Sequence, residues 1–242
     1  MEYTDLAKLK PFRTILLKGS PGSGKTYKAG HFPNPVFFDF DHNLHGLNML
    51  PPEIKSKVRI VDPAMKANVK LKGTQVWDNF IDQLGQVASD PSVNTIVIDS
   101  LTTLQEFLLD KILGSSVPST AVQIQHWGAM VRYWKHFAEE VLCNPTLDKH
   151  VIICAHERIL EDETSGVKVL RFALNLGGSM KDSFDLYFSD VWRTYVDVSK
   201  SGSPKYMVAT EPNKSYTAKR SLEMPPTFEW DLIKNKLLEK IA

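Results

Sequence analysis

The feature that most constrains this chain is a glycine-rich segment that follows a short apolar run. Residues 14–17 read as a buried strand, and they lead into Gly19-Ser-Pro-Gly-Ser-Gly-Lys25-Thr26. This segment fits the pattern G-x-x-x-x-G-K-[ST] at every fixed position, which is the signature of a phosphate-binding P-loop. A helix is expected to begin at about Lys25. The order of strand, loop and helix indicates an α/β sheet with a ligand site at the carboxyl ends of its strands.

The residue types of this loop suit a nucleoside triphosphate. Glycines let backbone N–H groups turn inward around a phosphate, and a lysine can reach the β- and γ-phosphate oxygens. The Thr26 hydroxyl is a hard oxygen ligand of the kind that Mg²⁺ prefers. We therefore expect ATP and Mg²⁺ as cofactors; the nucleotide-binding residues would be Gly19, Ser20, Pro21, Gly22, Ser23, Gly24, Lys25, Thr26 and Tyr27. The alternative is a loop that only turns the chain.

Length and composition indicate one globular domain. The 242 residues, 43% of them hydrophobic, can bury one substantial core. We expect a single domain over 1–242, with a lead-in at 1–13 and a terminal helix at 230–241. The formal charge of +1 gives no overall basic field, so nucleic-acid binding would need local patches or many copies side by side.

Two further features bear on the compartment. Cys143 and Cys154 are the only cysteines in the sequence and form no C-x-x-C pair, so neither a disulfide framework nor a zinc site is expected. The N-terminus shows no basic flank followed by an apolar core, and no uncharged apolar run is long enough to span a bilayer. We expect a protein of the reducing cytoplasm that does not contact a membrane.

Hydrophobic periodicity predicts the remaining elements. Buried parallel strands are expected at 36–40, 58–61, 94–99 and 150–155, and helices at 75–88, 101–113, from about 122 to 141, and near 179–184. Residues 158–172 read as an exposed hairpin. Antiparallel strands are expected at 191–198, 206–210 and 215–218 on the C-terminal side.

Three polar residues stand at the expected carboxyl ends of strands. Asp99 ends a β-branched apolar run, which is the form of a Walker B strand that delivers a carboxylate to Mg²⁺; capping the next helix is the alternative. Asp41 follows the apolar run at 36–40, and His156 follows the one at 150–155. A strand-end histidine that is merely hydrogen-bonded is the alternative for His156.

A cluster of basic residues lies between 51 and 72, around Arg59. Without interleaved aromatic residues it reads as a solvated surface more readily than as a nucleic-acid patch.

The order of these motifs resembles the RecA/DnaB class of P-loop ATPases, and more closely the compact phage nucleotide-binding proteins of that class, which include single-strand annealing recombinases. Five ordered motifs carry the resemblance: the P-loop, Phe37-Phe-Asp-Phe-Asp41-His-Asn-Leu44, Val97-Ile-Asp99-Ser100, His156 after the strand at 151–155, and Ala218-Lys219-Arg220. The resemblance implies a RecA-like core with a mostly parallel central sheet, helices on both faces and antiparallel strands at the C-terminal side.

The same resemblance assigns roles to residues of this sequence. Asp41 falls where the class keeps the glutamate that polarises the attacking water, and it is one methylene shorter, which implies slow hydrolysis. His156 falls at the position that senses the γ-phosphate. Lys219 and Arg220 match the stretch that reaches a neighbouring subunit's nucleotide, although adjacent strand residues point to opposite faces and a solvated strand end is the alternative. Residues 114–125 and 157–178 fall at the DNA-binding loops.

The leading hypothesis is therefore a Mg-ATP-dependent phage recombination ATPase that forms a filament or ring on single-stranded DNA and promotes annealing or strand pairing. Catalytic residues would be Lys25, Asp41, His156, Lys219 and Arg220; Thr26 and Asp99 would bind the metal. This role brings a single-strand-binding protein as a further partner and the bacterial host cytoplasm as the location. The alternatives are a nucleotide-gated loader with little turnover, and a small-molecule P-loop kinase, for which no arginine-rich lid is found.

Overall fold

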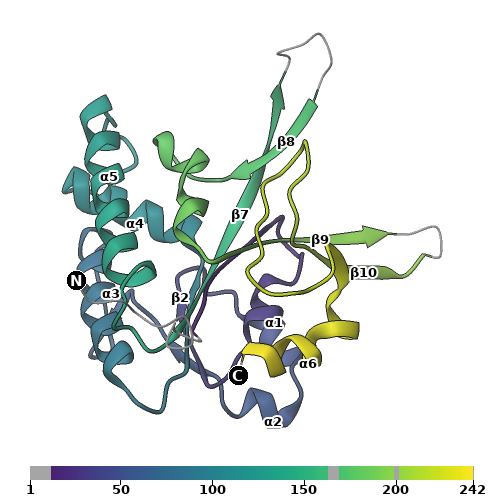
Figure 1. Cartoon of the computed structure of the whole chain (residues 1–242). Helices are drawn as coiled ribbons and strands as arrows, with labels where there is room; N and C mark the ends of the chain where they lie inside the picture. The colour runs from purple at the N-terminus through teal and green to yellow at the C-terminus, as the bar shows by residue number, and fades with distance from the viewer. Residues whose placement is uncertain (1–11, 163–168, 199–201, 242) are drawn as a thin grey trace, which may run out of the picture.

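The computed structural model describes residues 12–162, 169–198 and 202–241, and shows one large sheet with helices packed on both faces (Figure 1). The N-terminal lead-in up to residue 11 and the tip of the expected hairpin at 163–168 lie outside the described residues. The strand order is β11-β10-β9-β1-β7-β6-β2-β3, with β8 paired to β7. The elements that form this sheet are β1 (Thr14–Gly19), β2 (Pro35–Asp39), β3 (Arg59–Val61), β6 (Thr95–Asp99), β7 (His150–Asp162), β8 (Val169–Leu174), β9 (Asp190–Val198), β10 (Pro204–Ala209) and β11 (Thr227–Glu229).

Two layers of helix cover the sheet. One face carries α3 (Gly73–Ser89), α4 (Leu101–Leu113) and α5 (Ile124–Phe137), which runs on into a π-helical turn (Ala138–Leu142). The opposite face carries α1 (Lys25–Ala29), α2 (Pro52–Lys55) and α6 (Trp230–Ile241). Trp77 and Trp134 pack in the first core and Trp230 in the second. Short 3₁₀ helices lie at His45–Met49, Gly178–Asp182 and Phe184–Tyr187.

Strand β1 occupies the middle of the sheet because both of its faces are apolar. Ile15 and Leu17 pack in one core and Leu16 in the other, and all three side chains are fully buried. Parallel neighbours, β7 and β9, flank it on its two sides. A short apolar run that is buried on both faces is the expected form of such a strand.

The predicted fold class is confirmed. The strands β1, β2, β3, β6, β7 and β9 run parallel, whereas β10 and β8 are antiparallel to their neighbours. The expected hairpin is present, but its first strand is the continuation of β7, which runs without a break from the core into the projecting arm (Figure 1).

The prediction of a strand at 215–218 is wrong. Tyr216 bridges Phe172 of β8, whereas Lys219 bridges Val191 of β9. Because the two bridges lead to different strands, the segment cannot build a continuous ladder with either one. It instead crosses between the base of the β7–β8 arm and the beginning of β9.

Several short elements gave no periodic signal in the sequence. These are β4 (Met65–Lys66) and β5 (Val69–Lys70), joined by a two-residue turn in which Ala67 and Asn68 both have positive φ, together with α2 and β11. The basic cluster of residues 51–72 overlaps these short elements. Arg59 of this cluster forms an ion pair with Asp90 at 3.0 Å, so one positive charge of the cluster is paired within the chain.

Within the described ranges, no helix combines the length and apolar character that crossing a membrane requires.

His150 at the beginning of β7 is a buried titratable group. Its Nδ1 accepts a hydrogen bond from the Arg13 backbone N–H at 3.2 Å, and its ring packs edge-on against Phe12. The residue is only 3% exposed, and burial lowers its pKa to about 4. The structure therefore holds this imidazole neutral.

We predict that His150 makes the fold acid-sensitive. In the unfolded chain its pKa returns to about 6.5, so the unfolded state binds an extra proton between pH 6.5 and 4, and stability falls as the pH drops through that window. Lowering the pH from 7 to 5 should cost about 2 kcal/mol through this group. His150→Asn should flatten that dependence in urea unfolding curves, and replacing the exposed His45 should leave it unchanged. An equal slope in both variants would contradict the prediction.

Candidate functional site

The glycine-rich loop after β1 closes around the Lys25 ammonium group. Gly22 and Gly24 have φ of 76° and 80°, values that side chains rarely adopt. Lys25 Nζ donates to the carbonyl oxygens of Gly19 at 2.9 Å and Ser20 at 3.1 Å. Burial lowers the pKa of Lys25. A negatively charged oxygen beside the ammonium group would stabilise the protonated form of this lysine.

Gly19 is required for a different reason, which is the close approach of β9. A Cβ on Gly19 would lie 2.1 Å from the Thr194 carbonyl oxygen and 2.8 Å from Ser23 Oγ. The space is taken instead by a hydrogen bond between the hydroxyls of Ser23 and Thr194 at 2.7 Å. This bond ties the loop to β9.

The predicted metal ligands are in direct contact. Thr26 Oγ1 donates to Asp99 Oδ2 at 2.6 Å, although β7 separates β1, which precedes the loop, from β6, which carries Asp99. Asp99 is 6% exposed, and burial raises its pKa to about 6. A hydroxyl and a carboxylate are hard oxygen ligands, and a divalent cation between them would stabilise the ionised carboxylate, so the pair fits Mg²⁺.

Asp41 and His156 complete the cluster. His156 Nδ1 lies 3.4 Å from Lys25 Nζ, and its Nε2 lies 3.7 Å from Asp41 Oδ2. The Ser100 hydroxyl donates to Asp41 Oδ1 at 3.1 Å. Burial raises the pKa of Asp41, but the His156 side chain and nearby hydroxyls outweigh it, and the net pKa lies below the usual value. The imidazole therefore stands between the loop lysine and an ionised carboxylate.

These groups line one cavity of about 360 Å³. Its walls combine the loop and both acids with residues from later parts of the chain; they are Pro21, Gly22, Gly24, Lys25, Thr26, Tyr27, Asp41, Asn43, Gly46, Met49, Asp99, His156, Tyr206 and Asp231. The volume suits a nucleotide-sized ligand. Nine of the predicted residues thus meet at one cavity: Pro21, Gly22, Gly24, Lys25, Thr26, Tyr27, Asp41, Asp99 and His156.

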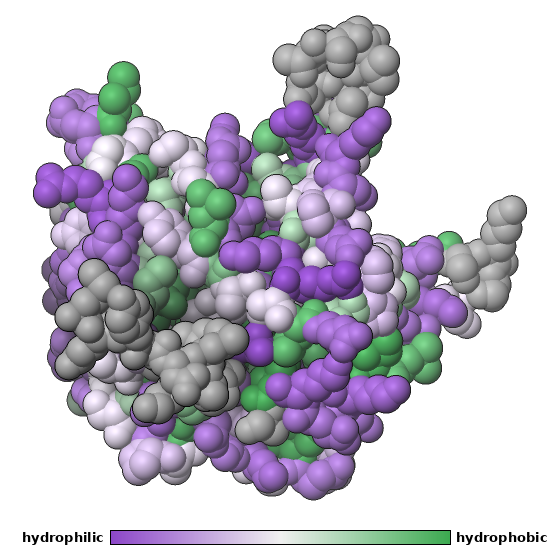
Figure 2. Space-filling model, in the orientation of Figure 1, coloured by the Kyte–Doolittle hydropathy of each residue, from purple (hydrophilic) through white to green (hydrophobic). Residues whose placement is uncertain are grey.

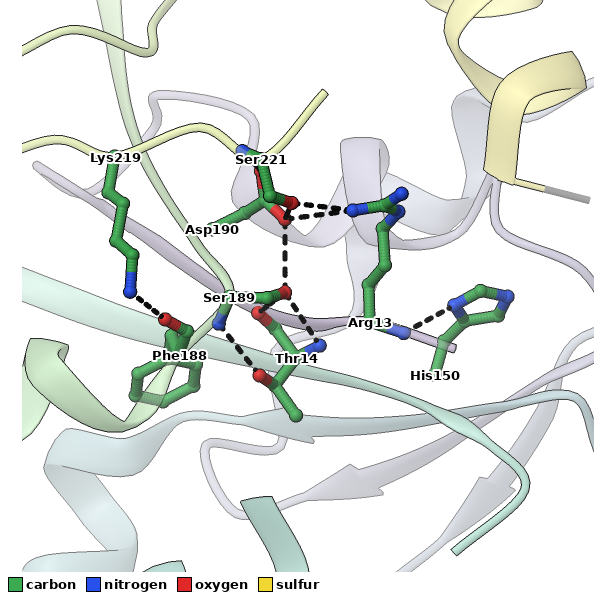
Figure 3. Close-up of polar contacts among 8 residues, drawn as sticks. All are labelled: Arg13, Thr14, His150, Phe188, Ser189, Asp190, Lys219 and Ser221. Carbon is green, nitrogen blue, oxygen red and sulfur yellow. Dashed lines mark hydrogen bonds and ion pairs between the residues drawn. The ribbon is translucent and has the colours of Figure 1, made fainter. Parts of the chain in front are cut away.

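Lys219 and Arg220 lie elsewhere. Lys219 pairs through its backbone with Val191, which stands beside Leu16, three residues before the loop begins. The Lys219 ammonium donates to the Phe188 carbonyl at 2.7 Å (Figure 3), and Arg220 contacts the Glu211 carboxylate and the Met224 carbonyl. Neither residue is among the described residues that line the cavity.

A buried carboxylate fixes this segment at the beginning of β1. Asp190 is fully buried and accepts hydrogen bonds from the Ser221 backbone N–H at 2.8 Å and the Ser221 hydroxyl at 2.6 Å (Figure 3). Arg13 pairs with the same carboxylate at 3.7 Å. The segment that carries Lys219 is therefore held at the end of the sheet opposite the glycine-rich loop.

Sequence reasoning missed several residues at the cavity or beneath it, among them Lys28, Tyr206 and Asp231. Lys28 is fully buried, and its Nζ donates to the Ser23 carbonyl at 2.9 Å under the loop. Tyr206 of β10 places its ring 3.3 Å from where a Cβ on Gly24 would lie, and Asp231 of α6 reaches the cavity beside Tyr27. The contacts of Tyr206 and Asp231 join distant parts of the chain, so no local pattern could signal them.

A second polar cluster lies on the opposite face of β7, one residue after His156. Glu157 and Arg193 form an ion pair at 3.0 Å with exposed side-chain fractions of 1% and 10%. The Arg193 guanidinium lies 3.9 Å above the Phe172 ring of β8 and 4.8 Å from the Tyr216 ring. This cluster joins the base of the β7–β8 arm to β9.

A family model described as an AAA domain matches residues 12–222. No curated protein sequence matches the chain significantly. The similar solved structures include a KaiC-like protein from Pyrococcus horikoshii, with 16% identity over 87% of this chain and 83% of that one and a TM-score of 0.45. The flagellar accessory protein FlaH from Methanocaldococcus jannaschii shows 11% identity over 85% and 79%, with a TM-score of 0.39. An ATPase from the type III secretion system of pathogenic bacteria shows 13% identity over 78% of this chain and 54% of its own length, with a TM-score of 0.48.

The two kinds of glycine in the loop should respond differently to substitution. Gly22→Ala meets no atom within 4 Å and should cost only the strain of a left-handed residue, about 1 kcal/mol. Gly19→Ala must push β9 away from the loop and should cost about 3 kcal/mol or more. Thermal unfolding of both variants measures the difference, and an equal loss of stability would contradict it.

Proposed function

Because the chain belongs to the AAA domain family and is a nucleotide-binding P-loop ATPase, we propose that it binds and slowly hydrolyses Mg-ATP as an oligomer that acts on single-stranded DNA. The proposal for the nucleotide rests on three side chains that meet at the loop. His156 lies 3.4 Å from the Lys25 ammonium and 3.7 Å from the Asp41 carboxylate. Annealing or strand pairing in phage recombination, with a single-strand-binding protein as partner, is the role that the motif order suggests.

Each residue of the cluster has a task in this proposal. Lys25 neutralises the terminal phosphates, and Thr26 and Asp99 would hold Mg²⁺, which supplies further neutralisation of developing charge. The ionised Asp41 orients the attacking water and can accept its proton. His156 contacts both the loop lysine and Asp41, so its position depends on what those two groups bind.

Asp41 also favours a second candidate, a nucleotide-gated loader with little turnover. An aspartate is shorter than the glutamate of the RecA class, and Asp41 also accepts a hydrogen bond from the Ser100 hydroxyl at 3.1 Å, which occupies one of its oxygens. A shift of the attacking water by about 1 Å costs on the order of 100-fold in rate. If the protein is such a loader, it should bind ATP but release no phosphate even at saturating single-stranded DNA.

Substitution of the loop lysine tests the nucleotide site. Lys25→Ala should weaken ATP binding at least about 100-fold, because the loss of a buried charged hydrogen-bond donor costs roughly 3 kcal/mol. Titration with a fluorescent ATP analogue in Mg²⁺, followed by a phosphate-release assay, gives affinity and turnover separately. Lys57→Ala, an exposed lysine elsewhere, is the matched control. Unchanged ATP affinity in Lys25→Ala would refute the site.

The same variant tests whether Lys219 and Arg220 act across a subunit interface. In the proposed oligomer, Arg220→Ala chains keep an intact loop, whereas Lys25→Ala chains keep an intact Arg220. If Arg220 acts in trans, a mixture of Arg220→Ala and Lys25→Ala chains should recover part of the hydrolysis that neither variant shows alone. A mixture of Lys219→Ala and Lys25→Ala chains tests Lys219 in the same way. No recovery in either mixture would rule out a role in trans.

The β7–β8 arm supports the proposal for DNA. It continues the strand that carries His156, and its coloured surface mixes hydrophilic and hydrophobic side chains (Figure 2), with Ile159 61% and Leu170 47% exposed. Arg158 and Arg171 lie on the same face of the hairpin, since Arg158 pairs with Ala173 and Leu160 with Arg171. Two basic side chains on a projecting arm suit a phosphate backbone, although Glu161 lies on the other face.

Charge reversal on the arm should weaken DNA binding. Arg158→Glu should lower the affinity for a single-stranded oligonucleotide about tenfold in the presence of ATP, because it replaces attraction to phosphates by repulsion. Lys57→Glu makes the same change of charge in the basic cluster of residues 51–72 and should have little effect. Fluorescence anisotropy at two salt concentrations measures both variants. The reverse order of effects would move the DNA site to the basic cluster.

A further inference from the structure

The cavity has a second end that the phosphate chemistry does not use. His156 contacts both Lys25 and Asp41, and Thr26 contacts Asp99, so these five residues form one part of the wall, where the triphosphate and metal fit. The remaining walls come from the loop after β2 and from the C-terminal part of the chain, including Met49, Tyr206 and Asp231. In a nucleotide whose phosphates lie on the glycine-rich loop, the base must occupy this second end.

The second end offers apolar surfaces that suit a purine ring. The Tyr206 ring lies against the loop at Gly24 and is 37% exposed, and Met49 is 72% exposed. An aromatic ring and a thioether are both favourable neighbours for a flat heterocycle. These surfaces hold a base without distinguishing one base from another.

Asp231 adds a directional group. It stands at the beginning of α6, beside α1 (Figure 1), and among the described residues its donors are Tyr27 Oη at 3.3 Å and Lys234 Nζ at 2.5 Å. Both act on Oδ1, which leaves the lone pairs of Oδ2 for a ligand. Partial burial raises the pKa of Asp231, but the Lys234 hydrogen bond outweighs it and keeps the carboxyl ionised. An ionised carboxylate can only accept hydrogen bonds.

Tyr27 fixes where this acceptor lies. It directly follows Thr26, so its backbone begins where the phosphate-binding residues end, and its hydroxyl holds Asp231. The acceptor is therefore hydrogen-bonded to the residue that directly follows the phosphate-binding threonine.

We propose that Asp231 accepts a hydrogen bond from the 6-amino group of adenine and thereby selects ATP over triphosphates with an oxygen at that position. Guanine in the same pose would direct its O6 lone pairs at the carboxylate, and the two acceptors would repel each other. The inference rests on the proposed ATP function and names the residue that sets its base specificity.

The test removes the interacting atoms from each side in turn. The full-length protein is titrated in Mg²⁺ with ATP, with purine riboside triphosphate, which lacks only the amino group, and with GTP. The wild type should bind ATP at least about tenfold more tightly than purine riboside triphosphate, the range for a hydrogen bond to a charged group. Asp231→Ala should bind both equally, and Asp231→Asn, whose amide can donate, should gain affinity for GTP.

The controls separate this inference from the proposed function. Glu239→Ala removes an exposed acid from the same helix and should keep the wild-type preference. If the wild type binds ATP but shows no preference over purine riboside triphosphate, or if Asp231→Ala keeps that preference, the inference is overturned and the ATP function stands. If the wild type binds no triphosphate, the proposed function falls and the inference falls with it.

Discussion

The whole site depends on how closely β1 packs between β7 and β9. Gly19 lies beside His156 of β7 on one side and beside Thr194 of β9 on the other. Because β7 stands between β1 and β6, the histidine at the carboxyl end of the β7 core falls between the loop lysine and the two acids. On the β9 side, a Cβ on Gly19 would meet Thr194 and Ser23, so this glycine fixes how closely the loop packs against β9. On the other side, the strand order brings together groups that follow or end β1, β7, β6 and β2.

Much of this arrangement was predictable because it follows from local patterns. Each apolar run that became a core strand ends in a polar residue, and the carboxyl ends of parallel strands meet at one edge, so Asp41, Asp99 and His156 had to be neighbours once the strands were identified. The helix bounds at 101–113 and 230–241 were predicted to the residue, because capping signals such as Ser100 and Gly114 mark where α4 begins and ends.

What the sequence did not reveal is set by how segments fold onto one another, which local periodicity does not record. Lys28 occupies a position on a short helix where a solvated lysine would be expected, yet its ammonium is buried because the loop folds back over it and supplies the Ser23 carbonyl. The segment at 215–218 has the alternation of a strand but finds only single partners on β8 and β9. Local periodicity measures what a segment can form, whereas the neighbours available to it decide the outcome.

The C-terminal part of the chain contacts both the cavity at the carboxyl ends of the parallel strands and the opposite end of the sheet, where β1 begins. This arrangement limits how copies of the chain could assemble. Tyr206 and Asp231 lie at the cavity, whereas Lys219 is fixed at the beginning of β1 by the hydrogen bonds between Ser221 and Asp190. If Lys219 or Arg220 serves a neighbour's nucleotide, the contact joins one end of the sheet in one subunit to the other end in the next. Such a contact uses two different surfaces and is heterologous, so it generates rings or filaments and excludes a two-fold dimer built on that interface.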